Sequence, residues 1–197
     1  MNFEAFEEKN EWIVAGLGNP GMTYAKTWHN CGYMAAEMLS QKLGVRVNKA
    51  KFKSAYGESF YKGIKIHILK PETYMNLSGR AIRDAAEYYK IPPTRILVFF
   101  DEIDLPLGTV RLRMKGSSGT HNGMKSVIYE LGSENFPRIR FGFGPLPEHI
   151  DLRTYVLSKV GGNEEKELFS ALDRGTDAAL ILISGNVDEA MRTVALS

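Results

Sequence analysis

Short apolar runs alternate with segments of helical periodicity along most of the chain. Continuous apolar runs bounded by turn residues predict buried strands, and apolar positions three to four residues apart predict helices. The predicted strands are residues 12–17, a hairpin of 54–61 and 64–70 around Lys62-Gly63, and then 95–100, 109–115 and 138–144. The predicted helices are residues 32–43, 77–90, 124–131, 167–184 and 187–196.

This alternation predicts an α/β fold, a single-domain three-layer sandwich with a mixed, mostly parallel sheet flanked by helices. Gly44 is suited to end the helix at 32–43, and Pro92-Pro93 to stop the one at 77–90. No repeat, low-complexity tract or linker divides the chain. We therefore expect an acidic N-terminal extension over residues 1–11 and one domain over 12–197.

Composition narrows the class of protein and its compartment. Of the 197 residues 44% are hydrophobic and 24% charged, which is ordinary for a globular domain. No apolar run approaches the roughly 18–20 residues that span a bilayer, and the acidic N-terminus does not resemble a signal peptide. The single cysteine, Cys31, excludes an internal disulfide and suits a reducing compartment, so the cytosol is expected.

The net charge of +2 conceals an uneven distribution. Residues 42–70 hold eight Lys/Arg against one acid, residues 105–146 hold six against two, and residues 147–197 hold nine acids against five bases. This asymmetry predicts a surface that faces a polyanion and a separate acidic surface. The alternative is that the lysines simply keep exposed strands soluble.

Polar side chains gather where predicted strands end or helices begin. They are Asn19 in GLGNPG, His29 and Asn30 in TWHN, Asn76 in YMNLSG, Asp101 in FDEIDLP and Asn122 in GTHNG. Open α/β sheets bind ligands at the carboxyl ends of their strands. One imidazole, one carboxylate and several amides suit a site that transfers protons and holds carbonyl or hydroxyl groups.

His29 is the candidate base, because a helix N-terminus disfavours a positive charge on the imidazole. Asp101 hydrogen-bonded to it would fix its tautomer, and Asp101→Asn is expected to shift the acidic limb of the pH–rate profile upward. The alternatives are a structural histidine, and acids that brace the turn before Pro106 or bind a metal. Neither H-E-x-x-H nor Cys/His spacing accompanies these acids.

Other readings of these segments remain open at this point. Asn76 and Asn122 could be helix caps. Cys31 offers a thiol, but its helical setting resembles core packing. GLGNPG matches the dinucleotide fingerprint, yet Pro20 and a bulky polar run replace the expected small-residue helix, which favours a sharp turn presenting Asn19. Four arginines alternate on two strands and either face solvent or bind phosphates: Arg111, Arg113, Arg138 and Arg140.

Taken together, the motifs resemble those of the bacterial-type peptidyl-tRNA hydrolase family. GLGNPG, Tyr24, His29-Asn30, PETYMNLSG, DEIDLPLG, SSGTHNG and RIRFGFG follow one another in the order and spacing of that family, over about residues 12–185. The resemblance implies a monomeric α/β enzyme that cleaves the ester between a peptide and the 3′ ribose of tRNA, without a metal or organic cofactor. The implied partner is peptidyl-tRNA, through its acceptor stem, 3′ end and 5′ phosphate.

The resemblance also implies roles for single residues. His29 corresponds to the base that activates water, Asp101 to its supporting carboxylate and Asn19 to the residue that distinguishes N-blocked from free aminoacyl ends. The implied substrate-cleft positions are Tyr24, Asn30, Tyr74, Met75, Asn76 and Asn122. Arg113 and Arg140 fit a basic pocket for the tRNA 5′ phosphate.

Two segments depart from the family pattern. Trp28 stands where the family often has arginine, and PLPEHIDLRTYVL follows RIRFGFG in place of a commoner G-R/H-P beginning. These departures affect the expected lid of the cleft and some tRNA contacts. The rival reading is a catalytically silent RNA-binding member of the same fold, similar to plastid splicing cofactors, which would require an added apolar partner surface.

Overall fold

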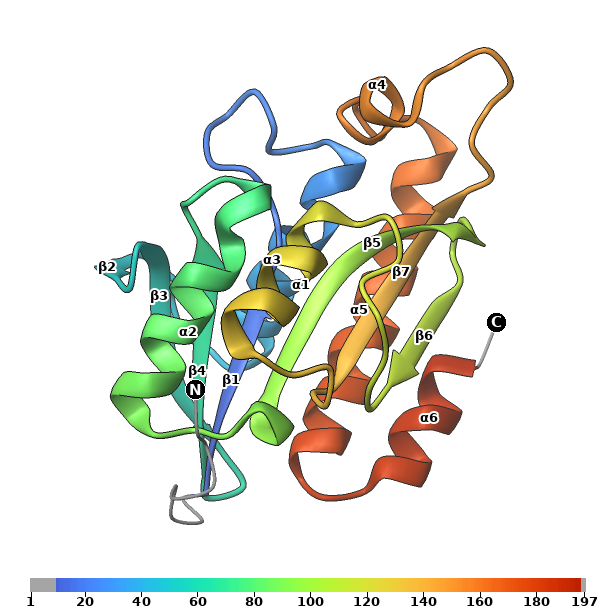
Figure 1. Ribbon diagram of the computed structural model, residues 1–197. Helices are drawn as coiled ribbons and strands as arrows, with labels where there is room; N and C mark the ends of the chain where they lie inside the picture. Colours follow the sequence, from blue (N-terminus) through green and yellow to red (C-terminus); the bar gives the residue numbers. More distant parts are fainter. Residues whose placement is uncertain (1–9, 196–197) are drawn as a thin grey trace.

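A computed structural model of the protein describes residues 10–195 and contains one seven-stranded sheet between helical layers (Figure 1). The strands are β1 (Glu11–Gly16), β2 (Lys49–Lys51), β3 (Ser54–Tyr61), β4 (Ile64–Pro71), β5 (Ile96–Pro106), β6 (Val110–Arg113) and β7 (Arg138–Gly144). The α-helices are α1 (Cys31–Lys42), α2 (Ser78–Tyr89), α3 (Asn122–Leu131), α4 (Leu152–Val156), α5 (Asn163–Ile183) and α6 (Val187–Ala195). Three short 3₁₀ helices are η1 (Trp28–Asn30), η2 (Met75–Leu77) and η3 (Pro93–Arg95).

The sheet has the order β2-β3-β4-β1-β5-β7-β6. The four adjacent strands β4, β1, β5 and β7 run parallel, whereas β2–β3, β3–β4 and β6–β7 pair antiparallel. The prediction of a mixed sheet flanked by helices is confirmed. Because the central strands are parallel, their carboxyl ends meet at one edge of the sheet.

Helices cover both faces of the sheet, which explains why its central strands are continuous apolar runs. In β1, Val14 belongs to the core beneath α1, α5 and α6, whereas Ile13 and Ala15 belong to the core beneath α2 and α3. Figure 1 shows α2 and α3 over one face and α1 and α5 over the other. None of the helices within residues 10–195 is both long and apolar enough to cross a membrane.

Several element boundaries differ from those predicted. β1 begins at Glu11, one residue before the expected domain boundary, and β5 continues to Pro106 rather than ending before Asp101. The polar sequence DEIDLP remains extended because it pairs with β7, with a register shift between Glu102 and Pro106. β2 and α4 were not predicted, since three and five residues are too short to carry a periodic signal. The predicted end of the last helix, Leu196, lies outside the described residues.

Glycines bring α1 unusually close to the end of β1. A Cβ on Gly32 would lie 2.4 Å from the Phe99 carbonyl oxygen and 2.5 Å from the Leu17 nitrogen. A Cβ on Gly16 would meet the Gly32 carbonyl oxygen at 2.1 Å, and one on Gly18 would meet the ring of Tyr33. Gly16 and Gly18 of GLGNPG thus serve the packing of α1 against the end of β1.

Candidate active site

The predicted polar residues surround a cleft at the carboxyl ends of the parallel strands. The cleft has a volume of about 670 Å³. Eight of the predicted site residues line it, namely Asn19, Tyr24, His29, Tyr74, Met75, Asn76, Asp101 and Asn122. These residues come from five places: the turn that follows β1, the helices η1 and η2, the strand β5, and the start of α3. The order of the strands in the sheet, rather than proximity in the sequence, therefore assembles the site.

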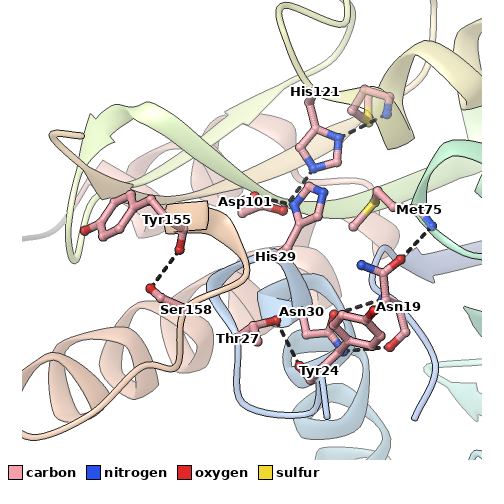
Figure 2. Close-up of polar contacts among 11 residues, drawn as sticks. Asn19, Tyr24, Thr27, His29, Asn30, Met75, Asp101, His121, Tyr155 and Ser158 are labelled. Carbon is pink, nitrogen blue, oxygen red and sulfur yellow. Dashed lines mark hydrogen bonds and ion pairs between the residues drawn. The ribbon is translucent and has the colours of Figure 1, made fainter. Parts of the chain in front are cut away.

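Asp101 joins two imidazoles inside this cleft (Figure 2). Its Oδ2 lies 2.8 Å from His29 Nδ1, and its Oδ1 lies 2.9 Å from His121 Nε2. The Asp101 side chain is almost completely buried, whereas 13% of the His29 side chain is exposed. One carboxylate therefore links two imidazoles that both line the cleft.

The hydrogen bonds determine the tautomers of both rings. His121 caps α3, and its Nδ1 accepts a hydrogen bond from the Met124 backbone N–H at 3.1 Å. In the neutral ring the proton must then be on Nε2, which donates it to Asp101. The other carboxylate oxygen accepts from His29 Nδ1–H, which leaves His29 Nε2 with a lone pair to accept a proton.

The pKa shifts of Asp101 and His29 support an ionised carboxylate beside a basic imidazole. Burial disfavours ionisation of Asp101, but the charges and hydrogen bonds of His29 and His121 outweigh it and hold the pKa of Asp101 below its usual range. Burial also lowers the pKa of His29, yet the charge and hydrogen bond of Asp101 outweigh this, so the pKa of His29 is raised from 6.5. Asp101 is thus an anion that strengthens His29 as a base.

We expect Asp101→Asn to move the acidic limb of the kcat/KM pH profile to lower pH and to reduce the maximal rate. With His29 as the predicted base, its unprotonated form is lost as pH falls through a pKa that Asp101 raises. In Asp101→Asn the neutral amide removes the negative charge that raises the pKa of His29. The burial of the ring remains, and burial lowers that pKa. This direction reverses the sequence-based expectation of an upward shift, because the Asp101 anion stabilises the imidazolium and its removal lowers the pKa of His29.

The pH dependence of kcat/KM reports the free enzyme and is the measurement required. Asp104→Asn is the matched control, because Asp104 is exposed on the same strand and should leave the limb in place. An acidic limb that stays in place or rises in Asp101→Asn would contradict the assigned role of Asp101.

Asn19 is held so that one face of its amide remains available. Its Oδ1 accepts the Met75 backbone N–H at 2.9 Å, and its own backbone forms two bonds of 2.9 Å with the Asn30 side chain. Since a backbone N–H can only donate, the atom facing Met75 must be the oxygen. The amide nitrogen therefore faces the cleft as a donor, on the side toward His29 in Figure 2.

The residues on either side of this donor also line the cleft. Tyr74 is 58% exposed and has a φ of 61°, a strained conformation for a side chain other than glycine. The strained turn presents the Met75 N–H to Asn19. Asn76 and Asn122 are exposed at the starts of η2 and α3, and the side-chain cap of α3 is His121 rather than Asn122. Both amides are thus available to a ligand.

Three predicted binding residues lie outside the cleft. Asn30 is 1% exposed and its amide is occupied by the Asn19 backbone, so in this structure it positions Asn19, and substrate binding by Asn30 stays a prediction. Arg113 is exposed on the edge strand β6. Arg140, on β7, pairs with Glu102 at 3.2 Å. Arg138 is buried and donates to backbone carbonyls of residues 116, 117, 134 and 136, a structural role.

The alternative chemistries fit this geometry poorly. Cys31 is buried, and burial first and the charge of Asp101 second raise the pKa of its thiol, which disfavours the nucleophilic thiolate. The dinucleotide reading requires a helix that opens at the third glycine, whereas α1 begins at Cys31, ten residues later.

The site also contains side chains of the types that bind metal ions. Over residues 10–195, the one group of potential ligand atoms close enough together is His29, Asp101 and His121, within 4.8 Å of one another. A ligand nitrogen must be unprotonated. His121 Nε2 instead carries the proton that it donates to Asp101, because its Nδ1 is already an acceptor. The three residues therefore fit a hydrogen-bonded relay better than a metal cage.

A further wall of the cleft includes the segment expected to affect its lid, but the individual lining residues were not predicted. Phe143 and four residues of the 152–157 segment line it: Leu152, Arg153, Val156 and Leu157. Trp28 is 2% exposed and stacks on Phe143 with ring centroids 5.7 Å apart, and Tyr155 of α4 packs on both rings. The two departures from the family pattern thus pack against each other, and only their joint presence in the sequence hinted at this contact.

The fold and the cleft define an α/β protein with an acid–base pair and an amide donor at the carboxyl edge of its sheet. The sequence profile of the peptidyl-tRNA hydrolase family matches residues 13–197. The chain belongs to the peptidyl-tRNA hydrolase family, as its motifs predicted.

Individual relatives agree with this assignment. A peptidyl-tRNA hydrolase from Caldanaerobacter subterraneus subsp. tengcongensis is 48% identical over 91% of this chain and 97% of its own. A peptidyl-tRNA hydrolase from Finegoldia magna is 45% identical over 91% of this chain and 95% of its own. The crystal structure of peptidyl-tRNA hydrolase from Acinetobacter baumannii superposes with a TM-score of 0.89 at 33% identity, covering 95% of this chain and 96% of that chain.

Proposed function

We propose that this protein hydrolyses the ester bond between the peptide and the tRNA of peptidyl-tRNA, which frees the tRNA for reuse in translation. The observation that carries the proposal is the His29–Asp101 pair, with its free Nε2, in the same cleft as the Asn19 amide donor. Family membership supplies the substrate class.

In the proposed reaction, His29 Nε2 removes a proton from a water molecule as the water oxygen attacks the ester carbonyl carbon. The carbonyl oxygen becomes an oxyanion, which the Asn19 amide N–H stabilises as a hydrogen-bond donor. The C–O bond to the 3′ ribose then breaks, and the imidazolium returns its proton to that leaving oxygen. Asp101 holds the ring and stabilises its cationic form throughout.

The basic residues on β6 and β7 support a tRNA-binding surface beside the cleft, and one of them, Arg140, is already paired with Glu102. In the 42–70 segment, five lysines are paired with acids: Lys42, Lys49, Lys53, Lys65 and Lys70. Within residues 10–195, no ion pair uses Arg111, Arg113 or Lys115 on and after β6. In the sheet register Arg111 lies opposite Arg140, and Arg113 opposite Arg138. We propose that Arg113 and Arg140 contact the 5′ phosphate and that this edge carries the acceptor stem.

The silent RNA-binding alternative shares this basic edge but does not require an ordered acid–base pair. The fixed tautomer of His29 and the oriented amide of Asn19 favour catalysis. Action without a cofactor, a monomeric state and a cytosolic location remain predictions of the resemblance and the cysteine content.

The direct test is hydrolysis of N-acetyl-aminoacyl-tRNA compared with unblocked aminoacyl-tRNA, followed by release of the acylated amino acid. We expect catalytic turnover of the blocked ester and much slower cleavage of the unblocked one. Binding of the blocked substrate without turnover would refute the enzymatic proposal and favour the silent RNA-binding alternative.

A further inference from the structure

Arg153 is a cation of the cleft that the reaction described above does not use. It extends from α4 into the wall of the cleft that contains His29. Its side chain is exposed, and no ion pair within residues 10–195 involves it. An arginine that faces a catalytic cleft without an acidic partner is available to an anionic ligand.

The carboxylates of the cleft do not compete for this guanidinium. Asp101 accepts from the two imidazoles, and Glu102 pairs with Arg140 at 3.2 Å. The nearest acid along the chain, Asp151, caps α4 by accepting from the backbone and the hydroxyl of Thr154. The anion that suits Arg153 must therefore come from the substrate.

The structure fixes α4 relative to the catalytic base. α4 packs on η1, the short helix that carries His29. Trp28 stacks on Phe143, and the Tyr155 hydroxyl donates to the Phe143 carbonyl oxygen at 3.2 Å. Backbone hydrogen bonds also join the segment after α4 to the residues before His29: Trp28 N donates to the Ser158 carbonyl, and Val160 N donates to the Lys26 carbonyl. Arg153 is therefore presented by a segment clamped to the residues beside His29.

The chemistry of the substrate identifies the anion. The ester that His29 would hydrolyse is on the ribose of the last nucleotide, and the phosphodiester joining that nucleotide to the preceding one lies across the same ribose. An arginine guanidinium forms paired hydrogen bonds with phosphate oxygens. We propose that Arg153 binds the phosphodiester between the last two nucleotides of the tRNA, an inference that rests on the proposed function.

This contact differs from that proposed for Arg113 and Arg140. Those two arginines lie outside the cleft on β6 and β7, where the proposed ligand is the phosphate at the 5′ end. Arg153 instead holds the 3′ end where its ester must meet His29. Its loss should therefore weaken binding of the reactive end and act mainly on KM.

The test combines one change in the enzyme with one change in the substrate. The substrate is N-acetyl-aminoacyl-tRNA whose terminal phosphodiester is replaced by a neutral methylphosphonate. We expect this replacement to raise KM of the wild type roughly tenfold, the size of one charge-assisted hydrogen bond at a partly exposed site. Arg153→Gln should have a similarly raised KM with ordinary tRNA. Because the contact is already absent, the methylphosphonate should raise the KM of this variant by less than about twofold. With ordinary tRNA, the KM of Arg153→Lys should lie between those of the wild type and Arg153→Gln.

Arg192→Gln is the matched control, since Arg192 is exposed on α6 and does not line the cleft. The methylphosphonate should raise the KM of Arg192→Gln as much as it raises that of the wild type. Equal losses in the wild type and in Arg153→Gln, or a wild type that is insensitive to the methylphosphonate, would overturn the assignment of Arg153. Turnover of unmodified blocked tRNA by the wild type would still support the proposed function, so the two failures are distinguishable.

Discussion

We expect His29→Ala to lower kcat by about 10²–10⁴-fold, the usual contribution of a positioned general base. The ring provides the free Nε2 of the cleft, and its other nitrogen is bonded to Asp101 at 2.8 Å. tRNA affinity should remain nearly unchanged, because the proposed phosphate contacts belong to other residues. Single-turnover rates and binding measured on the same N-acetyl-aminoacyl-tRNA separate the two quantities.

Two control variants make the His29 result specific. His149→Ala removes an exposed imidazole outside the cleft and should retain the wild-type rate. Cys31→Ser should also remain active, because the thiol is buried and its pKa is raised. Wild-type turnover by a folded His29→Ala variant would exclude His29 as the base, and an inactive, folded Cys31→Ser variant would reopen the thiol route.

The second large effect is expected from Asn19→Asp. The substitution keeps an oxygen to accept the Met75 N–H but replaces the cleft-facing N–H donor with a carboxylate oxygen. Loss of one donor to a developing oxyanion costs about 10²–10³-fold in kcat. Turnover of blocked aminoacyl-tRNA should therefore fall by that factor, without loss of the turn that carries residue 19.

Cleavage of unblocked aminoacyl-tRNA should fall less, so the ratio of blocked to unblocked kcat/KM should also decrease. A free α-amino group has a reference pKa of about 7.7–8.0 and is largely protonated near neutral pH. A carboxylate at position 19 attracts this ammonium group, whereas the wild-type amide N–H repels it. Asn135→Asp, which alters an exposed loop asparagine, should leave the ratio unchanged. An unchanged ratio in Asn19→Asp, with folding confirmed, would restrict Asn19 to supporting the turn.

The central strands and their covering helices could be predicted from the sequence because both faces of these strands are buried. Such burial produces the continuous apolar runs of β1 and β5, and it places the polar residues that follow them at one edge of the sheet. Asn19 and Asp101 could therefore be identified as candidates before any coordinates. The family motifs added Tyr74 and Met75, for which the local pattern gave no independent signal.

The features that escaped prediction depend on tertiary contacts. β5 extends through DEIDLP because β7 lies beside it, and its polar composition gives no sign of this pairing. The support of Asp101 by His121 follows from the placement of α3 next to β5, and the support of Asn19 by Asn30 from a turn that closes on η1. α4 packs through Tyr155 on Trp28 and Phe143, a contact that its own five residues do not reveal in the sequence.

The close approach at Gly32 has a consequence for how the site reaches its reactive arrangement. At Gly32 the backbone of α1 contacts Leu17, just after β1, and Phe99, within β5, with no side chain between them, and Leu17 N also donates to the Phe99 carbonyl oxygen at 2.9 Å. The segments bearing Asn19, His29 and Asp101 are therefore joined main chain to main chain. Such a framework is preorganised, so substrate binding need not expend free energy on bringing base and carboxylate together.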